Sequence, residues 1–494
     1  MAFILSLDEG TTSARAALYD EQGRRVAMES NSFPCHYPRQ GWVEQNPLDI
    51  WRAQLAAARR VMEVAGAGAA DIAAIGIANQ RETTIVWDRT TGEPVGPAIV
   101  WQCRRTADFC TALAASASAE LVTARTGLVV DAYFSASKIK WILDNVAGAR
   151  ARARDGELLF GNVDTWLIWK LTGGRVHATD PSNASRTMLM NLATGEWDRD
   201  LLSLFDIPVC ILPRIAPSSG VVGTTAAEHL GGEIPIAGIA GDQQAALFGQ
   251  ACFRPGLSKN TYGTGCFALL HTGAARPVSS NRLLATRAAS PDSTAQFAVE
   301  GSVFVAGAAV QWLRDQLGII QTAAQSEELA SRVETTEGVY FVPAFVGLGA
   351  PYWDMGARGT ITGLTRGSGA AHIARAALES IAYQTRDLVE AMEADSGERL
   401  AELRVDGGAT ANNFLMQFQA DVLGCRIVRP ADTETTALGA AYLAGLATGV
   451  WRSTAEVESF WRADRVFEPS LGQASRDRLY SGWKEAVRRS RGTL

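Results

Sequence analysis

Short apolar segments separated by polar turns that contain glycine mark the beginning of the chain. Residues 3–7 are mostly apolar, residues 8–13 are Asp-Glu-Gly-Thr-Thr-Ser, and the next six or seven residues are again largely apolar. This pattern predicts a strand, a turn and a second strand, which together form a β-hairpin. Residues 259–272 repeat the pattern around a Tyr-Gly-Thr-Gly-Cys sequence. We therefore predict a second hairpin in the second half of the chain.

Helical periodicity appears between the predicted strands. Asn46-Pro47 is typical of a helix start, because asparagine caps the first turn and proline fits the first helical position. The apolar residues that follow fall on one helical face: Ile50, Trp51, Leu55, Ala58 and Met62. Residues 72–78 form a short apolar strand, and a long amphipathic helix is predicted over residues 371–394. Strands that alternate with helices indicate an α/β fold.

The two hairpins suggest two related halves that face a shared ligand. A boundary near residue 250 divides the chain into predicted domains of residues 1–249 and 250–494. In the second half, a strand over residues 403–406 leads through two glycines into a helix over residues 414–423. A glycine-rich joint of this kind lets the backbone approach a nucleotide closely.

The charge balance and the cysteine pattern exclude several classes of protein. The chain has 46 basic and 52 acidic residues, a net charge of −6, which argues against a nucleic-acid or anionic-membrane partner. Its cysteines and histidines lack the spacing of disulfide scaffolds or zinc sites. No signal peptide is readable, and the longest uncharged apolar stretch, residues 339–353, is shorter than the ~20 residues that span a bilayer. We expect a cytoplasmic protein without membrane insertion.

Common signatures of nucleotide and acyl-transfer enzymes are missing from the sequence. None of the lysines follows a glycine, which excludes a P-loop, and no Gly-x-Ser-x-Gly elbow occurs. Residues 263–268 are Gly-Thr-Gly-Cys-Phe-Ala, but strand-like residues flank them on both sides. As a dinucleotide-binding fingerprint this segment is therefore weak.

The two polar turns are candidates for phosphate binding. In the first, backbone N–H groups and hydroxyls of residues 10–13 could surround phosphates while Asp8 holds Mg²⁺, directly or through water. In the second, residues 261–266 could cover the other phosphates. The alternative for each is an ordinary hairpin turn, which is rich in Asp and Gly for conformational reasons. The repetition of the turn favours the functional interpretation.

Two further polar clusters follow predicted strands. Asp242 comes directly after residues 236–240, at the strand end where ligands bind in α/β sheets, although it could also cap the next helix. Residues 79–84 are Asn-Gln-Arg-Glu-Thr-Thr. They are either a solvated loop with a weak ion pair, or a site where Arg81 and Glu82 bind vicinal hydroxyls, each of which donates and accepts a hydrogen bond.

Three aromatic residues could cover the C–H face of a small polyol: Trp101, Tyr133 and Phe267. Isolated aromatic side chains more often belong to the hydrophobic core, so for each of them the core remains the alternative.

Together these segments resemble the FGGY family of carbohydrate kinases. Residues 133–145, Tyr-Phe-Ser-Ala-Ser-Lys-Ile-Lys-Trp-Ile-Leu-Asp-Asn, are similar to the first family signature, and residues 359–379 are similar to the second. Four more segments are similar to those that separate the glycerol-phosphorylating members from the pentulose kinases: residues 7–13, 79–84, 241–246 and 261–267. The resemblance runs in order from residue 3 to about residue 485.

The resemblance implies two ribonuclease-H-like domains of the actin/hexokinase type, with ATP in the cleft between them and glycerol as the acceptor that becomes sn-glycerol 3-phosphate. It places Asp8 and Asp242 near Mg²⁺, and we assign Asp242 as the general base. By position, the ATP site consists of Thr11, Thr12, Ser13, Arg15, Thr264, Gly307, Gln311, Gly408 and Asn412. The glycerol site consists of Arg81, Glu82, Tyr133, Asp242 and Gln243, with Trp101 and Phe267 as apolar walls. A homodimer or homotetramer is also implied.

The sequence departs from the family pattern at two places. Glu9 stands where many relatives carry Gln, and its charge could alter the affinity for metal or phosphate. In relatives inhibited by fructose 1,6-bisphosphate, a glycine-rich loop ends in an arginine that binds phosphate. The corresponding residues 229–236 contain no arginine and present Glu233 instead. An anion there would meet like charge, so we expect no inhibition by this sugar phosphate.

Two alternatives to a glycerol-phosphorylating enzyme are considered. A kinase of the same family could act on a pentulose or tetritol, but Arg81, Glu82 and Phe267 argue against it. An ATP-driven binding protein on the actin or chaperone type of fold would need no polyol-binding residues, yet this chain has them beside a strand-end acid. Turnover with glycerol separates enzyme from binder, and relative kcat/KM over polyols separates the two kinases.

Overall fold

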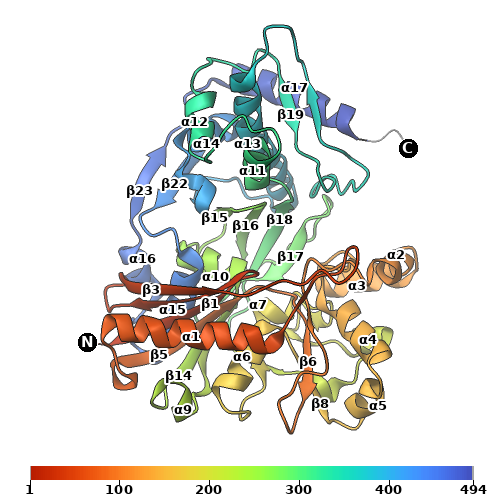
Figure 1. Cartoon of the computed structure of the whole chain (residues 1–494), viewed down its shortest axis with the longest axis vertical. Helices are drawn as coiled ribbons and strands as arrows, with labels where there is room; N and C mark the ends of the chain where they lie inside the picture. Colours follow the sequence, from red (N-terminus) through yellow and green to blue (C-terminus); the bar gives the residue numbers. More distant parts are fainter. Residues whose placement is uncertain (1, 492–494) are drawn as a thin grey trace.

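The computed structural model describes residues 2–491 and contains two large β-sheets, one from each half of the chain (Figure 1). The first sheet has the order β13-β14-β5-β1-β2-β3, with strands Ser219–Thr224, Pro235–Gly241, Ile72–Asn79, Phe3–Glu9, Ser13–Tyr19 and Arg25–Ser32. The second has the order β17-β18-β16-β15-β21-β22-β23, with strands Leu284–Arg287, Phe297–Val303, Cys266–Gly273, Ser258–Tyr262, Glu402–Asp406, Arg426–Pro430 and Ala463–Phe467.

The two sheets share one topology. In each, three successive antiparallel strands are followed by two strands that run parallel to the first: β1-β2-β3 with β5 and β14, and β15-β16-β18 with β21 and β22. The first two strands of each set are the hairpins predicted from the sequence, and both predictions are confirmed. Apart from β17, which is added at the edge of the second sheet, the strand order is the same in both halves, as expected if they are related.

Helices cover both faces of the first sheet. The helices that carry the argument below are α1 Pro47–Ala65, α4 Ser135–Asn145, α6 Val163–Leu171, α7 Pro181–Ala184, α9 Ala227–Leu230, α10 Asp242–Gly249, α11 Gly307–Asp315, α12 Gln325–Ala330, α13 Ala370–Ser396, α14 Asn413–Leu423, α15 Thr435–Thr448 and α17 Gln473–Ser490. The side chain of Asn46 caps α1 and Pro47 is its first residue, as predicted. Apolar residues of α1 and α6 pack on Leu5 and Leu7 of β1, whereas those of α15 pack on Ile4 from the other side.

Helix α15 belongs to the second half of the sequence but packs on the first sheet (Figure 1). The hydroxyl of Ser6 on β1 donates to the carbonyl of Ala437, at 2.6 Å. A Cβ atom at Gly76 on β5 would lie 2.1 Å from the carbonyl oxygen of Ala440, so only glycine permits this approach of helix to strand. The predicted domain boundary at residue 250 remains a prediction. Helix α15 lies after that boundary in the sequence but packs on the sheet formed by residues before it.

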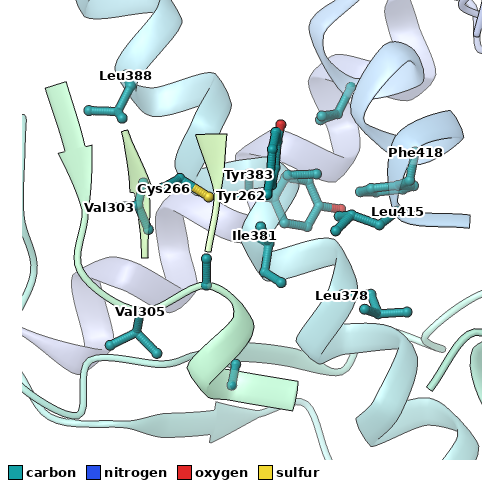
Figure 2. Packing of buried hydrophobic residues seen from close by; sticks show 14 of the residues in the cluster. Tyr262, Cys266, Val303, Val305, Leu378, Ile381, Tyr383, Leu388, Leu415 and Phe418 are labelled. Carbon is teal, nitrogen blue, oxygen red and sulfur yellow. The ribbon is translucent and has the colours of Figure 1, made fainter. Parts of the chain in front are cut away.

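The core of the second half lies between its sheet and the long helix α13 (Figure 2). Tyr262 and Val303 project from the strands, Ile381 and Leu388 from α13, and Phe418 from α14; all are at least nine-tenths buried. The tyrosine hydroxyl donates to the Oε1 of Gln419, at 2.8 Å. This packing fixes β15, and with it the turn that follows Tyr262, relative to the helices. Within residues 2–491, no helix is long and apolar enough to cross a membrane.

Candidate active site

The first polar turn joins β1 to β2, with Asp8 at its entrance. The Asp8 side chain is buried, and Arg15, its partner across the hairpin, lies 3.7 Å from it, Nη1 to Oδ2. The same arginine nitrogen lies 3.0 Å from the Oε2 of Glu434, at the start of α15. Thr11 accepts a hydrogen bond at its hydroxyl from Nε1 of Trp101, at 3.0 Å. The turn is thus joined to both Trp101 and α15.

The electrostatic environment of Asp8 favours a cation. Burial is the main cause that raises the pKa of Asp8 to about 7, and the charges of Asp242 and Glu434 add to it while Arg15 opposes it. Neighbouring Glu9 is fully buried, and neither of its carboxylate oxygens has a hydrogen-bond partner. Burial, followed by the charge of Asp8, raises the pKa of Glu9 well above its usual range. This favours the uncharged acid form of Glu9.

The second polar turn joins β15 to β16 and rests on the first turn of α11. The carbonyl of Thr264 accepts hydrogen bonds from the N–H groups of Ala306, at 2.8 Å, and Ala308, at 3.1 Å. The N–H of Gly307 donates to the carbonyl of Gly263, and a Cβ atom at Gly307 would lie only 2.6 Å from that oxygen. Gly307 is therefore required by the packing of the turn. Thr264 and Gln311 are exposed on its outer side.

The glycine-rich joint after β21 has two different glycines. Gly407 has φ +87° and a Cβ atom there would lie 2.5 Å from the carbonyl oxygen of Tyr262, so the backbone demands glycine. A Cβ atom at Gly408 would meet no protein atom within 4 Å, so the protein itself does not explain that residue. Space beside Gly408 fits the close approach of a ligand. Asn412 caps α14 through its Oδ1, which accepts from the N–H of Leu415 at 2.9 Å.

Arg81 and Glu82 follow β5 and are both buried, with exposed fractions of 3% and 1%. The interpretation of residues 79–84 as a solvated loop is therefore wrong. The pair itself is loose, 3.9 Å from Arg81 Nε to Glu82 Oε1, and Nε lies closer to Asp242 Oδ1, at 3.1 Å. Glu82 has φ +60°, which is rare for a residue with a side chain and is found most often at functional sites.

Two buried residues that sequence reasoning missed complete this cluster. Glu300 on β18 accepts from both terminal nitrogens of Arg81, at 2.5 and 2.9 Å. Arg186, after α7, donates to Glu82 at 2.7 Å and to Glu300 at 3.1 Å. Two arginines and two glutamates thus neutralise one another. Because of its arginine neighbours, and against the effect of burial, Glu300 has its pKa lowered to about 2.

Asp242 is the first residue of α10, at the carboxyl end of β14. The N-cap of that helix is Gly241, so the interpretation of Asp242 as a capping residue is wrong. The Asp242 carboxylate is 29% exposed, far more than that of Glu300. It accepts from the backbone N–H of Gln243 at 2.7 Å and from the Gln243 side-chain amide at 3.1 Å. Asp242 is thus held on three sides, by Arg81 and by both groups of Gln243, and open on another.

The three candidate aromatic residues lie together. The ring of Trp101 is 5.6 Å from that of Tyr133 and 6.5 Å from that of Phe267, both edge-on. All three are half-buried, unlike the fully buried aromatic residues of the core. Phe267 comes from β16 of the second half and the other two from the first half. The trio therefore forms an apolar wall to which both halves contribute, next to the charged cluster.

Sequence signals for the missed residues were present but weak. Glu300 is the single charged residue in the strand Phe297–Val303, every position of which is buried. A charge in such a strand is unusual and indicates a buried partner. Its partner Arg81 lies 219 residues away in the chain, so no local pattern could identify it.

Comparison with known proteins supports the motif analysis. The N-terminal domain of the FGGY family of carbohydrate kinases matches residues 3–249, and the C-terminal domain of that family matches residues 258–448. The chain belongs to this family. The resemblance inferred from the motifs is thereby confirmed, as is the α/β fold class with paired ribonuclease-H-like units.

Similar proteins cover the whole chain. A protein named glycerol kinase 2 from Thermotoga maritima is 61% identical over 492 residues, 100% of this chain and 99% of its own length. A glycerol kinase from Symbiobacterium thermophilum is 60% identical over 490 residues, 99% of this chain and 98% of its own. The crystal structure of Plasmodium falciparum glycerol kinase with ADP has a TM-score of 0.94 at 37% identity and covers 100% of this chain and 99% of that one. A xylulose kinase from Lactobacillus acidophilus, 23% identical over 98% of this chain and 97% of its own, shares the fold with a TM-score of 0.90.

Proposed function

We propose that this kinase transfers the γ-phosphoryl group of ATP to a terminal hydroxyl of glycerol and forms sn-glycerol 3-phosphate. The observation that carries the proposal is the cluster in which Arg81, Glu82 and Asp242 meet beside the aromatic wall. Buried charged donors and acceptors suit hydroxyl groups, which both donate and accept, while the wall suits the C–H face of a three-carbon polyol. The names of the relatives at 60–61% identity support the same acceptor.

In this proposal Asp242 is the general base. Its carboxylate is the exposed member of the cluster and can reach a bound hydroxyl, whereas Glu82 and Glu300 are occupied by arginines. Phosphoryl transfer passes through a loose transition state, so positioning and neutralisation of charge supply most of the catalysis. A glycerol hydroxyl is a very weak acid, and its proton moves to Asp242 late, as the new P–O bond forms.

The residues present fit a magnesium ion. Carboxylate oxygens are ligands that Mg²⁺ prefers, and the raised pKa of Asp8 reports a site where a nearby cation is favourable. Residues 2–491 contain no group of three or more acidic, His or Cys side chains arranged for a metal. We infer that Asp8 and Asp242 would hold Mg²⁺, and that the ion would neutralise phosphate charge.

The two polar turns would hold the phosphates of ATP, with Thr11, Thr12, Ser13 and Arg15 on one side and Thr264 on the other. The open space beside Gly408 suits the rest of the nucleotide, which Gly307, Gln311 and Asn412 would also line. Glycerol would contact residues of both halves in this arrangement, since Trp101 belongs to the first half of the chain and Phe267 to the second. Closure around glycerol would then exclude water, which otherwise competes as acceptor.

The first experiment is an assay of ADP release with Mg²⁺-ATP, comparing glycerol, dihydroxyacetone, erythritol and D-xylulose with a blank that lacks acceptor. Strong preference for glycerol over a low blank is expected. If another acceptor is preferred, the assignment of Arg81 and Glu82 to glycerol is wrong, although the nucleotide site stands. If no acceptor exceeds the blank, the chain is an ATP-binding protein and not a kinase of these polyols. Light scattering in the same buffer tests the homodimer or homotetramer that we include in the proposal.

A further inference from the structure

Lys259, the second residue of β15, is a buried lysine that reaches the candidate acceptor site from the second half. Its exposed fraction is 0%. The ammonium group donates to the side-chain oxygen of Gln243, to the hydroxyl of Thr261 at 2.8 Å and to the carbonyl of Phe267 at 3.2 Å. An ammonium group has three N–H donors, so these bonds use all of them.

The burial of Lys259 is not explained by ion pairing. None of the salt bridges among residues 2–491 includes it. Burial lowers the pKa of Lys259 from its usual value, while the charges of Asp406, Asp242 and Glu300 favour its charged form. Removing an ammonium group from water without a paired carboxylate costs several kcal/mol, which an apolar residue in the same strand would not incur. Because its burial is unfavourable, we expect Lys259 to have a role other than packing.

The bond to Lys259 determines the orientation of the Gln243 amide. A protonated lysine cannot accept a hydrogen bond, so the amide oxygen, not the nitrogen, must face it. The amide nitrogen then points to Asp242, and one of its N–H groups lies 3.1 Å from Oδ2. The second N–H group remains for another acceptor, so Gln243 presents a donor to a ligand.

We propose that Lys259 is a positioning residue that fixes the orientation of Gln243 as a donor and thereby aligns the hydroxyl that reacts. A hydroxyl that accepts from this amide N–H group has its own proton left to point at Asp242. If the amide were reversed, its oxygen would compete for that proton and repel the Asp242 carboxylate. This inference rests on the proposed function, because it assumes that Asp242 and Gln243 contact the acceptor.

A double-mutant cycle tests the inference, with Lys259→Met, Gln243→Ala and the double variant compared with the wild type. Methionine keeps most of the volume of the lysine stem and removes its donors. Each single substitution should lower kcat/KM for glycerol by about 10- to 100-fold, as expected for loss of a hydrogen bond to a charged group, and change KM for ATP less than about threefold. Because Lys259 acts through Gln243, kcat/KM of the double variant should be no more than about threefold lower than that of the poorer single variant.

The matched control is Lys484→Met, which replaces an exposed lysine on α17 and should behave as wild type.

Multiplied losses in the double variant would overturn the inference, since Lys259 would then act independently of Gln243. Equal increases in KM for ATP and glycerol would also overturn it, because they indicate general damage. Should Lys259→Met fail to fold, Gln243→Glu provides a second test. A carboxylate at this position can still accept from Lys259 but cannot donate, so activity should fall at least as far as with Gln243→Ala. Activity near that of the wild type would show that no donor is needed.

The wild-type arm separates this inference from the proposed function. If the wild type phosphorylates another polyol in place of glycerol, the proposed acceptor is wrong, but the cycle measured with that polyol still decides whether Lys259 acts through Gln243. A non-additive cycle then supports the positioning role, and a multiplicative one contradicts it.

Discussion

Glu300 binds both terminal nitrogens of Arg81, at 2.5 and 2.9 Å, although the two residues lie in different halves of the chain. This leaves Nε of Arg81 directed at Asp242, 3.1 Å away. The plane of the guanidinium is therefore set by a strand of the second sheet. In the proposed acceptor site, Glu300 would not bind the acceptor itself but would position Arg81, which would.

Replacement of Glu300 by glutamine should weaken acceptor binding more than nucleotide binding. Glutamine has a similar shape but only one acceptor oxygen and no charge, so Arg81 loses its bidentate partner and can tilt away from Asp242. Loss of one partner of a buried ion pair costs about 3–5 kcal/mol, part of it in stability. We expect KM for glycerol to rise at least tenfold while KM for ATP changes less than threefold, measured by steady-state kinetics.

The matched control is Glu379→Gln, which breaks another buried glutamate–arginine pair, with Arg375 on α13 at 2.8 Å. That variant should lose thermal stability and keep the wild-type KM for glycerol. A similar rise in KM for glycerol in both variants would contradict the positioning role of Glu300, because it would follow from lost stability alone.

Asp242→Asn should remove nearly all turnover and leave substrate binding largely intact. Asparagine keeps the size of the side chain and an oxygen for Arg81 but cannot take up the hydroxyl proton. General-base assistance is typically worth 10²- to 10⁴-fold, so kcat should fall by about that factor. Calorimetric titration of glycerol and of ADP checks binding. If the pure variant retains more than about a tenth of the wild-type kcat, Asp242 is not the base.

Local patterns were sufficient to predict much of the fold. The hairpins, the start of α1 at Pro47, the long α13 and the strand–glycine–helix joint before α14 are each specified within a few neighbouring residues, and each was predicted close to its observed bounds. These elements depend on alternation, periodicity and capping, which are properties of consecutive residues.

Relationships between distant residues could not be predicted in this way. Glu300 pairs with Arg81 across 219 residues, and Lys259 approaches Gln243 only because β15 and α10 pack together. Nor does the sequence of α15 indicate that it packs on the first sheet, since the glycine that admits it, Gly76, lies in β5. The sequence shows which charged residues follow the strands of the site. Which of them pair with one another is decided by tertiary packing.

The substitution Trp101→Phe tests the hydrogen bond between Trp101 and the first polar turn separately from the apolar wall. Phenylalanine keeps an aromatic surface next to Tyr133 and Phe267 but removes the N–H group that donates to Thr11. A neutral hydrogen bond is worth about 0.5–1.5 kcal/mol, so kcat should fall about 2- to 10-fold with little change in KM for glycerol. The ratio of ATP hydrolysis without glycerol to phosphorylation with it, measured as ADP release, should rise. An unchanged ratio would show that this bond does not couple the two parts of the site.

Fructose 1,6-bisphosphate should not inhibit the enzyme. Glu233 is exposed in the loop between α9 and β14, where it would repel a phosphate. The structure adds an arginine that the loop sequence lacks, since Arg59 on α1 reaches this loop. However, its Nε and a terminal nitrogen donate to the carbonyls of His229 and Glu228, at 2.8 and 3.2 Å. Wild-type activity should be unchanged at millimolar effector, with sulfate as the control anion; specific inhibition would show that Arg59 or another cation turns to bind phosphate.

Stability should decline in mild acid partly because of His271, which is buried on β16. Burial lowers the pKa of His271 from 6.5 to about 4, and its Nδ1 accepts from the N–H of Gly273 at 3.1 Å, a bond that the protonated ring cannot make. Between these two pH values His271 binds a proton in the unfolded chain but not in the folded chain. The contribution of His271 is thus complete above pH 6.5 and is lost as the pH falls toward 4, by about 3 kcal/mol in total. His271→Asn keeps an acceptor for Gly273 but cannot titrate, so its melting temperature should fall less than that of the wild type between pH 7 and pH 5. Parallel curves for the two proteins would show that His271 does not contribute to the acid sensitivity.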